Sequence, residues 1–381
     1  MPPPSSPRPR RVPRVVAAVV AVVVVAAGLV AWGLVRSSGG TTASSAHRAR
    51  AVPSPLGAGT GTGSTALAGT GAGDTHCTVS VTSFGASTSS PDNAPAFQAA
   101  VDAGAGGTVC VPAGTFAFTS EVVITGAEVL TGAGAWATTL VETVAGHNLL
   151  ADRADGTVVE DLTLDTQTHQ GGIAFSTGAS HVTLRDAHVL SGHTPGHFAL
   201  YFAGPPGARL DAPRYSTGNV LEDVTVSDQI CDDGVSWSFQ HDGTISDVSE
   251  TGSRLALYAD AGTTVDGYRY TPGPCLSSDD GFWITQPTSN VTIEHFVSSG
   301  AAGDVCALVN ARPCSHVTIE DEVAPAGILH VGNATGLTVR GSTVRGVVVF
   351  APLGATGTWS ASQPTSARCA KGLVVIAGLT C

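Results

Sequence analysis

A short β-prone pattern recurs along this chain and limits its fold more than any other feature. Each copy places Thr between branched or aliphatic residues, and copies begin at Val158, His181, Asn219, Gly243, Thr263, Asn290, His316 and Gly336. The intervals are 20 to 27 residues long, except for one of 38. Such a period is typical of a repeat array in which each coil buries its apolar side only against neighbouring coils.

A second apolar run precedes most copies of this pattern. The runs begin at Gly172, Phe198, Gly234, Leu255, Gly281, Cys306, Ile328 and Gly346. Stacked in register, they would form a parallel sheet whose side chains alternate between the inside and the outside. Isolated strands of this kind also suit an antiparallel sandwich, but the regular period and the absence of hairpin turns favour a solenoid. We expect an all-β parallel β-helix of about nine coils.

Composition and charge agree with an exported solenoid. Glycine is abundant, with 47 residues, and the chain has a formal charge of −12 although many of its arginines lie in the first fifty residues. An acidic folded part argues against nucleic acid as a partner. It fits carboxylate chemistry, cation binding or simple solubility. The eight cysteines lack a Cys-x-x-Cys motif, so disulfides in an oxidising compartment are the better inference.

The first 75 residues divide into two parts. Val15 to Val35 is an uncharged apolar run of 21 residues behind an arginine-rich flank, long enough to cross a bilayer as a helix of about 30 Å. We expect residues 1–36 to be an uncleaved membrane anchor or a signal peptide, with the bulk of the protein outside the cell. Residues 37–75 are rich in Gly, Ala, Ser and Thr and should form a disordered linker. The β-helix domain would then occupy residues 76–381.

A short helix is predicted near the start of this domain. Ser90 could cap it, Pro91 could occupy its first position, and Gly104 could end it. Ala94, Phe97 and Val101 share one face of such a helix. An amphipathic helix of this kind could cover the open N-terminal end of a solenoid core, and the last stretch, through Cys369, could cover the other end.

The residues around this helix carry a specific resemblance. The run VTSFGASTSSPDNAPAFQAAVDAGAGGTVCVPAGTF, followed by VLTGAGAWATTLV, resembles the opening of the pectate-lyase-like superfamily of right-handed parallel β-helices. The resemblance covers about 65 residues and is nearest to the polygalacturonase/pectate-lyase-3-type branch. It implies the fold. Hydrolases, lyases, epimerases and phage tail proteins share this opening, so the resemblance leaves the chemistry open.

Acidic residues gather at one predicted corner of successive coils, just before the apolar run. They are Asp232, Asp233, Asp279, Asp280 and Asp304, with Arg254 on the coil between the two pairs. Since coils lie about 4.8 Å apart, Asp233 and Asp280 would be about 10 Å apart. Two carboxylates separated by roughly 6.5 to 9.5 Å suit an inverting glycosidase. We predict Asp280 and Asp233 as the acid/base pair; the alternative is that the two Asp-Asp-Gly sequences are simply turns.

The alternation of side chains along each strand predicts a substrate-binding set around these acids. If Leu255 and Phe282 point inward, then Tyr258 and Trp283 point outward. The predicted set is Arg254, Tyr258, Trp283, Asp260, Gln240 and, in a loop at the edge, His197. Aromatic faces beside acids are typical of sugar-binding grooves. The alternative is that such aromatics cover a neighbouring coil.

The resemblance bears on the reaction as well. The polygalacturonase branch carries Gly-His-Gly and Arg-x-Lys motifs that this sequence lacks, which puts galacturonan hydrolysis in doubt. We predict a carbohydrate-active enzyme that hydrolyses a polysaccharide without a cofactor. The alternatives are a Ca²⁺-dependent polysaccharide lyase and a non-catalytic glycan-binding or envelope solenoid. We expect the protein to be a monomer.

The cysteines allow a set of near-neighbour disulfides. The expected pairs are Cys77–Cys110, Cys231–Cys275, Cys306–Cys314 and Cys369–Cys381. Each would join residues close in sequence or on adjacent coils. No metal site is expected from these residues, because zinc spacings are absent.

Overall fold

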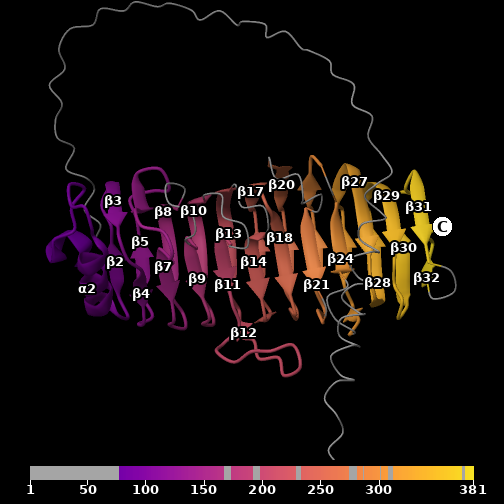
Figure 1. Ribbon diagram of the computed structural model, residues 1–381, viewed down its shortest axis with the longest axis horizontal. Helices are drawn as coiled ribbons and strands as arrows, with labels where there is room; N and C mark the ends of the chain where they lie inside the picture. The colour runs from indigo at the N-terminus through magenta and orange to yellow at the C-terminus, as the bar shows by residue number, and fades with distance from the viewer. Residues whose placement is uncertain are drawn as a thin grey trace, which may run out of the picture. The chain divides into compact units, whose positions relative to one another are not determined.

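The computed structural model describes residues 77–166, 173–191, 198–228, 233–273, 281–285, 287–300, 302–307, 312–370 and 374–381. Within these ranges, thirty strands form one continuous sheet wound into a right-handed parallel β-solenoid of about ten turns (Figure 1). This confirms the all-β parallel β-helix that the repeat predicts, with about one turn more than expected. A full turn passes through three faces, which we call faces I, II and III.

Face I contains the recurring Thr-centred segments. Its strands, in pairing order, are β1 (Val79–Ser80), β2 (Thr108–Cys110), β5 (Val129–Thr131), β8 (Val158–Asp165), β10 (Thr183–Ser191), β13 (Val220–Asp228), β16 (Thr244–Ser246), β19 (Thr264–Asp266), β22 (Thr292–Glu294), β26 (Thr318–Glu320), β28 (Ala334–Arg340), β30 (Ala355–Ser360) and β32 (Val374–Ala377). The pairing is in register with the sequence repeat, because Thr264 lies opposite Thr292 and Thr292 lies opposite Thr318.

Faces II and III complete each turn. Face II contains β3 (Gly114–Phe118), β6 (Thr138–Glu142), the second halves of β8, β10 and β13, then β17 (Ser249–Gly252), β20 (Arg269–Pro272), β23 (Val297–Ser298) and the starts of β27 (Val323–Val331) and β29 (Thr343–Val349). Face III contains β4 (Val122–Ile124), β7 (Leu150–Asp152), β9 (Phe175–Thr177), β11 (Leu200–Phe202), β14 (Asp233–Ser238), β18 (Arg254–Tyr258), β21 (Phe282–Thr285), β24 (Gly303–Ala307), the ends of β27 and β29, and β31 (Ser366–Cys369).

Single residues in the left-handed conformation turn the chain at two corners. Between faces I and II they are Asp161, Asp186, Asp223, Asp247, Gly267, His295, Asp321 and Gly341. Just before face I they are Gly156, His181, Gly218, Asp242, Gly262, Asn290, His316 and Gly336. The non-glycine members have φ between 48° and 58°. Gly, Asn, Asp and His tolerate positive φ better than branched residues do, which explains why these types recur at both corners.

The apolar side chains of successive turns stack inside the solenoid. Phe175 contacts Phe202, and Phe202 contacts Trp237, with ring centroids 5.7 Å and 4.4 Å apart. Trp237 is fully buried, and its indole Nε1 donates to Thr263 Oγ1 at 3.1 Å. The premise that Leu255 and Phe282 point inward holds, since both are 0% exposed. The core is therefore one continuous apolar column that holds the outward residues of face III in fixed register.

The helix expected near the start of the domain is present as α2 (Ala94–Gly104), which follows β1 and a short 3₁₀ turn, η1 (Val81–Phe84). Its buried residues include Phe97, which contacts Phe116 and Phe118. The predicted start at Ser90 and Pro91 is wrong: Asn93 is the N-cap residue, and Pro95 lies in the first turn. The preceding residues are not helical because they are docked on β3 and the residue after it: Asn93 N donates to Ala117 O, and Asp92 Oδ1 accepts from Thr119 N.

Three of the expected disulfides are present: Cys77–Cys110, Cys306–Cys314 and Cys369–Cys381. Cys231 and Cys275 lie outside the described residues. The stretch after residue 354, predicted to close the C-terminal end, instead extends the solenoid, since β30, β31 and β32 pair with β28, β29 and β30.

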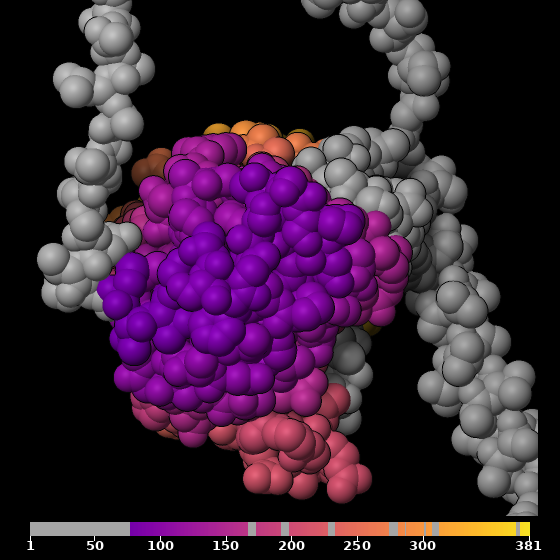
Figure 2. All heavy atoms as spheres, turned by 90° about the vertical axis from the view of Figure 1, so that its left-hand side faces the viewer, coloured from indigo at the N-terminus to yellow at the C-terminus, as the bar shows by residue number. Residues whose placement is uncertain are grey.

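An inserted loop interrupts the repeat between β11 and β12 (Ser216–Thr217), which pairs with β15 (Gln240–His241). It explains the one long interval in the sequence, and Figure 2 shows it projecting from the body. Leu210 O accepts a hydrogen bond from Arg312 Nη1 at 3.3 Å. Arg312 lies just before β25 (Cys314–Ser315), so the loop reaches a much later turn.

The expected anchor or signal segment and the linker lie outside the described residues. The part of the chain that the structure describes contains no helix long and apolar enough to cross a membrane.

Candidate functional site

One outward row of side chains runs across face III at a single position of each strand. In pairing order its members are Val123, Ala151, Ser176, Tyr201, Ser236, Ala256, Trp283, Asp304, His330, Val348 and Arg368. Neighbouring strands lie about 4.8 Å apart, so adjacent members are in contact range. The chemistry-bearing residues Trp283, Asp304 and His330 are consecutive in this row. Face III therefore places an aromatic ring, a carboxylate and an imidazole side by side.

A compact polar cluster adjoins this row. Arg254 Nε donates to Asp233 Oδ1 at 2.8 Å, and the Tyr258 hydroxyl donates to Asp233 Oδ2. The Arg254 guanidinium carbon lies 4.0 Å from the centroid of the Trp283 ring, and Tyr258 meets the same ring edge-on at 5.5 Å. The structure thus brings together four of the residues predicted from the sequence: Asp233, Arg254, Tyr258 and Trp283.

Burial separates the roles within this cluster. The Asp233 side chain is 1% exposed and Arg254 is 14% exposed, whereas Trp283 and Tyr258 are partly exposed. A carboxylate held by a guanidinium and a phenol in this way fixes the positions of both partners. The geometry of Asp233 therefore suits holding Arg254 and Tyr258 in place. Arginine over the face of an indole is a cation–π contact that also orients the ring.

Asp304 forms a second polar group with a residue that the sequence analysis left unassigned. His330 Nδ1 lies 2.7 Å from Asp304 Oδ1, and the two residues are direct neighbours on β24 and β27. Their side chains are 46% and 23% exposed, respectively. They line a cavity of about 180 Å³ together with Val305, Val331, Gly332, Val348 and Phe350. His330 could have been found from the alternation in the run ILHVG, which points it outward between Leu329 and Val331.

Two predicted binding residues are displaced from the site. Gln240 and Asp260 are 0% exposed, so the prediction that both are accessible to a substrate on the outer surface is wrong. The alternation of side chains fails here because the residue before each of them has a positive φ, 54° at Phe239 and 50° at Ala259. The extended strands therefore end at Ser238 and Tyr258, before Gln240 and Asp260 are reached. The pKa of Asp260 is raised to about 7, because the effect of burial exceeds the opposing effect of hydrogen bonds from Thr263 and the Ala261 backbone. Gln240 Nε2 instead donates to Ala203 O and Ser238 O.

Asp232, Asp279, Asp280 and His197 lie outside the described residues. Among the residues that are described, no group of three or more His, Cys, Asp or Glu side chains is arranged to hold a metal ion. The absence of a cofactor stays a prediction, as does the Ca²⁺ requirement that the lyase alternative carries.

A second depression lies toward the N-terminal turns of face III. It has a volume of about 400 Å³ and is lined by Tyr201, Asn148, Ser176, Arg153 and the start of the inserted loop. Asn148 Nδ2 donates to Glu121 Oε2 and to Ser176 Oγ, so its amide is held in place. The Tyr201 ring stacks on Phe198 with centroids 5.0 Å apart. Face III thus carries hollows on both sides of the Asp233 cluster.

Comparison with known proteins bears on the fold. No protein-family model and no curated protein matches this sequence. The A-module of the mannuronan C-5 epimerase AlgE6 of Azotobacter vinelandii is similar, with a TM-score of 0.53 and 16% identity over 79% of this chain and 98% of that chain. The enzymatically active domain of tailspike protein 2 of bacteriophage CBA120 gives a TM-score of 0.54 and 11% identity over 74% of this chain and 47% of that chain. These similarities confirm the parallel β-helix fold that the resemblance implies.

Proposed function

We propose that this protein is an extracellular enzyme that hydrolyses a polysaccharide bound along face III. The observation that carries the proposal is the consecutive placement of Trp283, Asp304 and His330 beside the Asp233–Arg254 pair. An aromatic face, a partly exposed carboxylate and an ordered arginine are the groups that bind and cleave sugars in acid/base hydrolysis. Their position on a repetitive surface suits a repetitive ligand.

The geometry favours a polymer over a small molecule. Each turn adds one strand to face III, and successive strands are about 4.8 Å apart. A solenoid therefore presents an extended surface whose subsites repeat along its axis. The hollows at Tyr201 and at His330 lie on either side of Trp283 in the same row. A parallel β-helix is also the fold of the mannuronan C-5 epimerase module, which makes a glycan ligand compatible with this architecture.

The surroundings of Asp233 and Asp304 indicate different roles for these two carboxylates. Asp233 is buried against Arg254 and acts in this proposal by positioning Arg254 and Tyr258. Asp304 is exposed enough to reach a bound sugar and belongs to the proton-transfer machinery. Asp280, predicted from the sequence at the turn before β21, is assigned as the general acid, with Asp279 and Asp232 in support. A separation of roughly 6.5 to 9.5 Å between acid and base would make the enzyme inverting.

The proposed location is outside the cell. Disulfides persist in oxidising compartments, and the described residues contain three of them. The apolar run from Val15 to Val35 would act as the export signal or as the membrane anchor.

A polysaccharide panel tests the proposal. The full chain is incubated with neutral and acidic glycans while new reducing ends and absorbance near 235 nm are followed together. Hydrolysis predicts new reducing ends without the absorbance change, and Asp280→Asn should abolish them without lowering the unfolding midpoint. An increase in absorbance that a chelator abolishes would contradict hydrolysis and indicate Ca²⁺-dependent β-elimination. Retention of a glycan without any cleavage would overturn the enzyme proposal in favour of a binding solenoid.

A further inference from the structure

The hollow around Tyr201 is shaped by small side chains on neighbouring strands. The outward positions of β7, β9 and β11 are Ala151, Ser176 and Tyr201, which pair in that order. Because Ala151 and Ser176 are small, the Tyr201 ring borders a hollow of about 400 Å³. Gly204 also lines it, and a Cβ atom at this position would lie 2.5 Å from the Phe239 Cβ. The register of three strands therefore fixes the shape of the hollow.

Tyr201 offers an aromatic surface to this hollow. Its ring is partly exposed and stacks on Phe198, with centroids 5.0 Å apart and an angle of 26° between the ring planes. Burial raises the pKa of the Tyr201 hydroxyl above its ordinary value of 10.0, so the phenol is uncharged at neutral pH. A neutral phenol can both donate and accept a hydrogen bond, as a sugar hydroxyl can. The ring is thus ordered by Phe198 and suited to an uncharged polar ligand.

Polar side chains line the same hollow. Asn148 Nδ2 donates to Glu121 Oε2 at 2.8 Å and to Ser176 Oγ at 3.1 Å. Both amide hydrogens are therefore used within the protein, and Oδ1 is the atom of this amide that can accept from a ligand hydroxyl. The Arg153 side chain is 66% exposed, and its Nη2 lies 3.6 Å from Glu121 Oε1. Exposed ion pairs of this kind are weak, so the hollow presents a fixed acceptor and a guanidinium that can donate to a ligand.

The charge of the hollow disfavours an anionic ligand. Asp152 lines it and is 1% exposed, with Oδ1 accepting from Thr157 Oγ1 and Oδ2 accepting from Thr177 Oγ1. Burial raises the pKa of Asp152 to about 6, so this carboxyl group is mostly ionised above that pH. Glu121 and Asp152 then place two negative charges beside the single positive charge of Arg153. The formal charge of −12 on the whole chain acts in the same direction at longer range, so an uncharged sugar fits better than a uronate.

We propose that the hollow around Tyr201 is a secondary sugar site, which binds an uncharged sugar unit of the polysaccharide cleaved beside Trp283. The choice of a glycan as the ligand rests on the proposed function. Tyr201 and Trp283 are three strands apart in the outward row, at about 14 Å. Ser236 and Ala256 lie between them and are 0% exposed, so the two rings border separate sites. A long glycan can contact both sites, and the second contact raises its overall affinity.

Calorimetric titration of the full chain with oligosaccharides tests this site. The probes are neutral gluco- and manno-oligosaccharides and anionic oligogalacturonates, each from the disaccharide to the octasaccharide. The wild type should bind a neutral octasaccharide more tightly than the oligogalacturonate of equal length. Tyr201→Ala should weaken binding of that neutral octasaccharide roughly tenfold, because one aromatic contact is lost, and Tyr201→Phe should restore it. Arg153→Ala, at an exposed residue, should weaken it about fivefold, as for one hydrogen bond.

Tyr215 provides a matched control. It is also a partly exposed tyrosine beside an aromatic ring, with its centroid 5.9 Å from that of His241, but it does not line the hollow. Tyr215→Ala should therefore bind every oligosaccharide as the wild type does. All variants should keep the wild-type circular dichroism spectrum.

The possible outcomes separate the secondary site from the proposed hydrolysis. Equal octasaccharide affinity in the wild type and in Tyr201→Ala would overturn the secondary site even if the wild type cleaves a polysaccharide, as would a wild type that binds no neutral oligosaccharide. Tighter binding of oligogalacturonates would overturn the uncharged ligand. Weakened binding in Tyr201→Ala, with no cleavage of any glycan by the wild type, would support the secondary site and refute the hydrolysis.

Discussion

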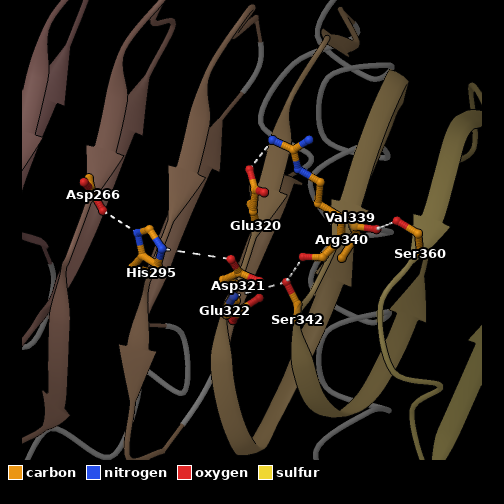
Figure 3. Close-up of polar contacts among 9 residues, drawn as sticks. All are labelled: Asp266, His295, Glu320, Asp321, Glu322, Val339, Arg340, Ser342 and Ser360. Carbon is orange, nitrogen blue, oxygen red and sulfur yellow. Dashed lines mark hydrogen bonds and ion pairs between the residues drawn. The ribbon is translucent and has the colours of Figure 1, made fainter.

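Glu322 is an acidic side chain inside the solenoid core, and its replacement tests the structure quantitatively. It lies in the inward column of face II between Phe296 and Ser342, and it is 0% exposed. Its backbone N–H donates to Ser342 Oγ, but neither carboxylate oxygen has a hydrogen-bond partner in the described part of the chain (Figure 3). Burial raises the pKa of Glu322 from its ordinary 4.5 to about 8.

A carboxyl group with a raised pKa makes the folded state less stable as pH rises. Well below pH 4.5 the carboxyl group is protonated in both the folded and the unfolded states, so it adds no pH-dependent cost. Between pH 4.5 and 8 the unfolded chain loses the proton while the folded chain keeps it, and the cost grows by about 1.4 kcal/mol per pH unit. Above pH 8 the cost levels off at about 5 kcal/mol. Glu322→Gln removes this term and should stabilise the protein most at high pH.

Urea unfolding at pH 5, 7 and 9 measures the effect. The gain in the free energy of unfolding for Glu322→Gln over the wild type should rise from below about 1 kcal/mol at pH 5 to several kcal/mol at pH 9. Glu320→Gln is the control, because Glu320 lies two residues away and pairs with Arg340 at the surface. Its effect should stay within about 1 kcal/mol at every pH. A Glu322→Gln gain that is the same at pH 5 and pH 9 would refute the burial of an ionisable carboxyl group at this position.

Two further predictions concern the corners and the disulfides. Asp223 has a φ of 50°, so Asp223→Val should lower the free energy of unfolding by about 1–2 kcal/mol. Asp223→Gly should be close to neutral. Equal urea midpoints for the two variants would contradict the corner geometry. Replacing Cys306 and Cys314 together by Ser should lower the free energy of unfolding by about 2.5 kcal/mol, because the disulfide closes an 8-residue loop. The double replacement should also lower activity, because Cys306 lies two residues after Asp304. An unchanged unfolding midpoint would contradict the predicted loss of stability.

Most of the fold could be predicted from the sequence because every turn of a solenoid contains the same pattern of apolar and turn-forming residues. The period of the Thr-centred segments sets the register of face I. Strand alternation, with Leu255 and Phe282 in the core, placed Tyr258 and Trp283 at the surface, where both are partly exposed. The start of α2 was misplaced because Ser90 and Pro91 have the right residue types for a helix start. The contacts of Asp92 and Asn93 with other strands override those local preferences.

The candidate site was predicted less completely, for reasons that lie in the corners. Alternation holds only while the backbone stays extended, and the positive φ of Phe239 and Ala259 turned Gln240 and Asp260 inward. Neither residue type signals positive φ, so the sequence carried no warning. His330 was missed because it bears no local motif. Its importance comes from pairing with Asp304, which is 26 residues earlier in the chain.

The structure of a complex would test the central claim most directly. The full chain is crystallised with the longest oligosaccharide that it binds, using Asp280→Asn to prevent turnover. The account predicts sugar rings on face III, with one ring stacked on Trp283 and the chain continuing past Asp304 toward His330. An oligosaccharide bound on face I or face II, with Trp283 uncovered, would contradict it.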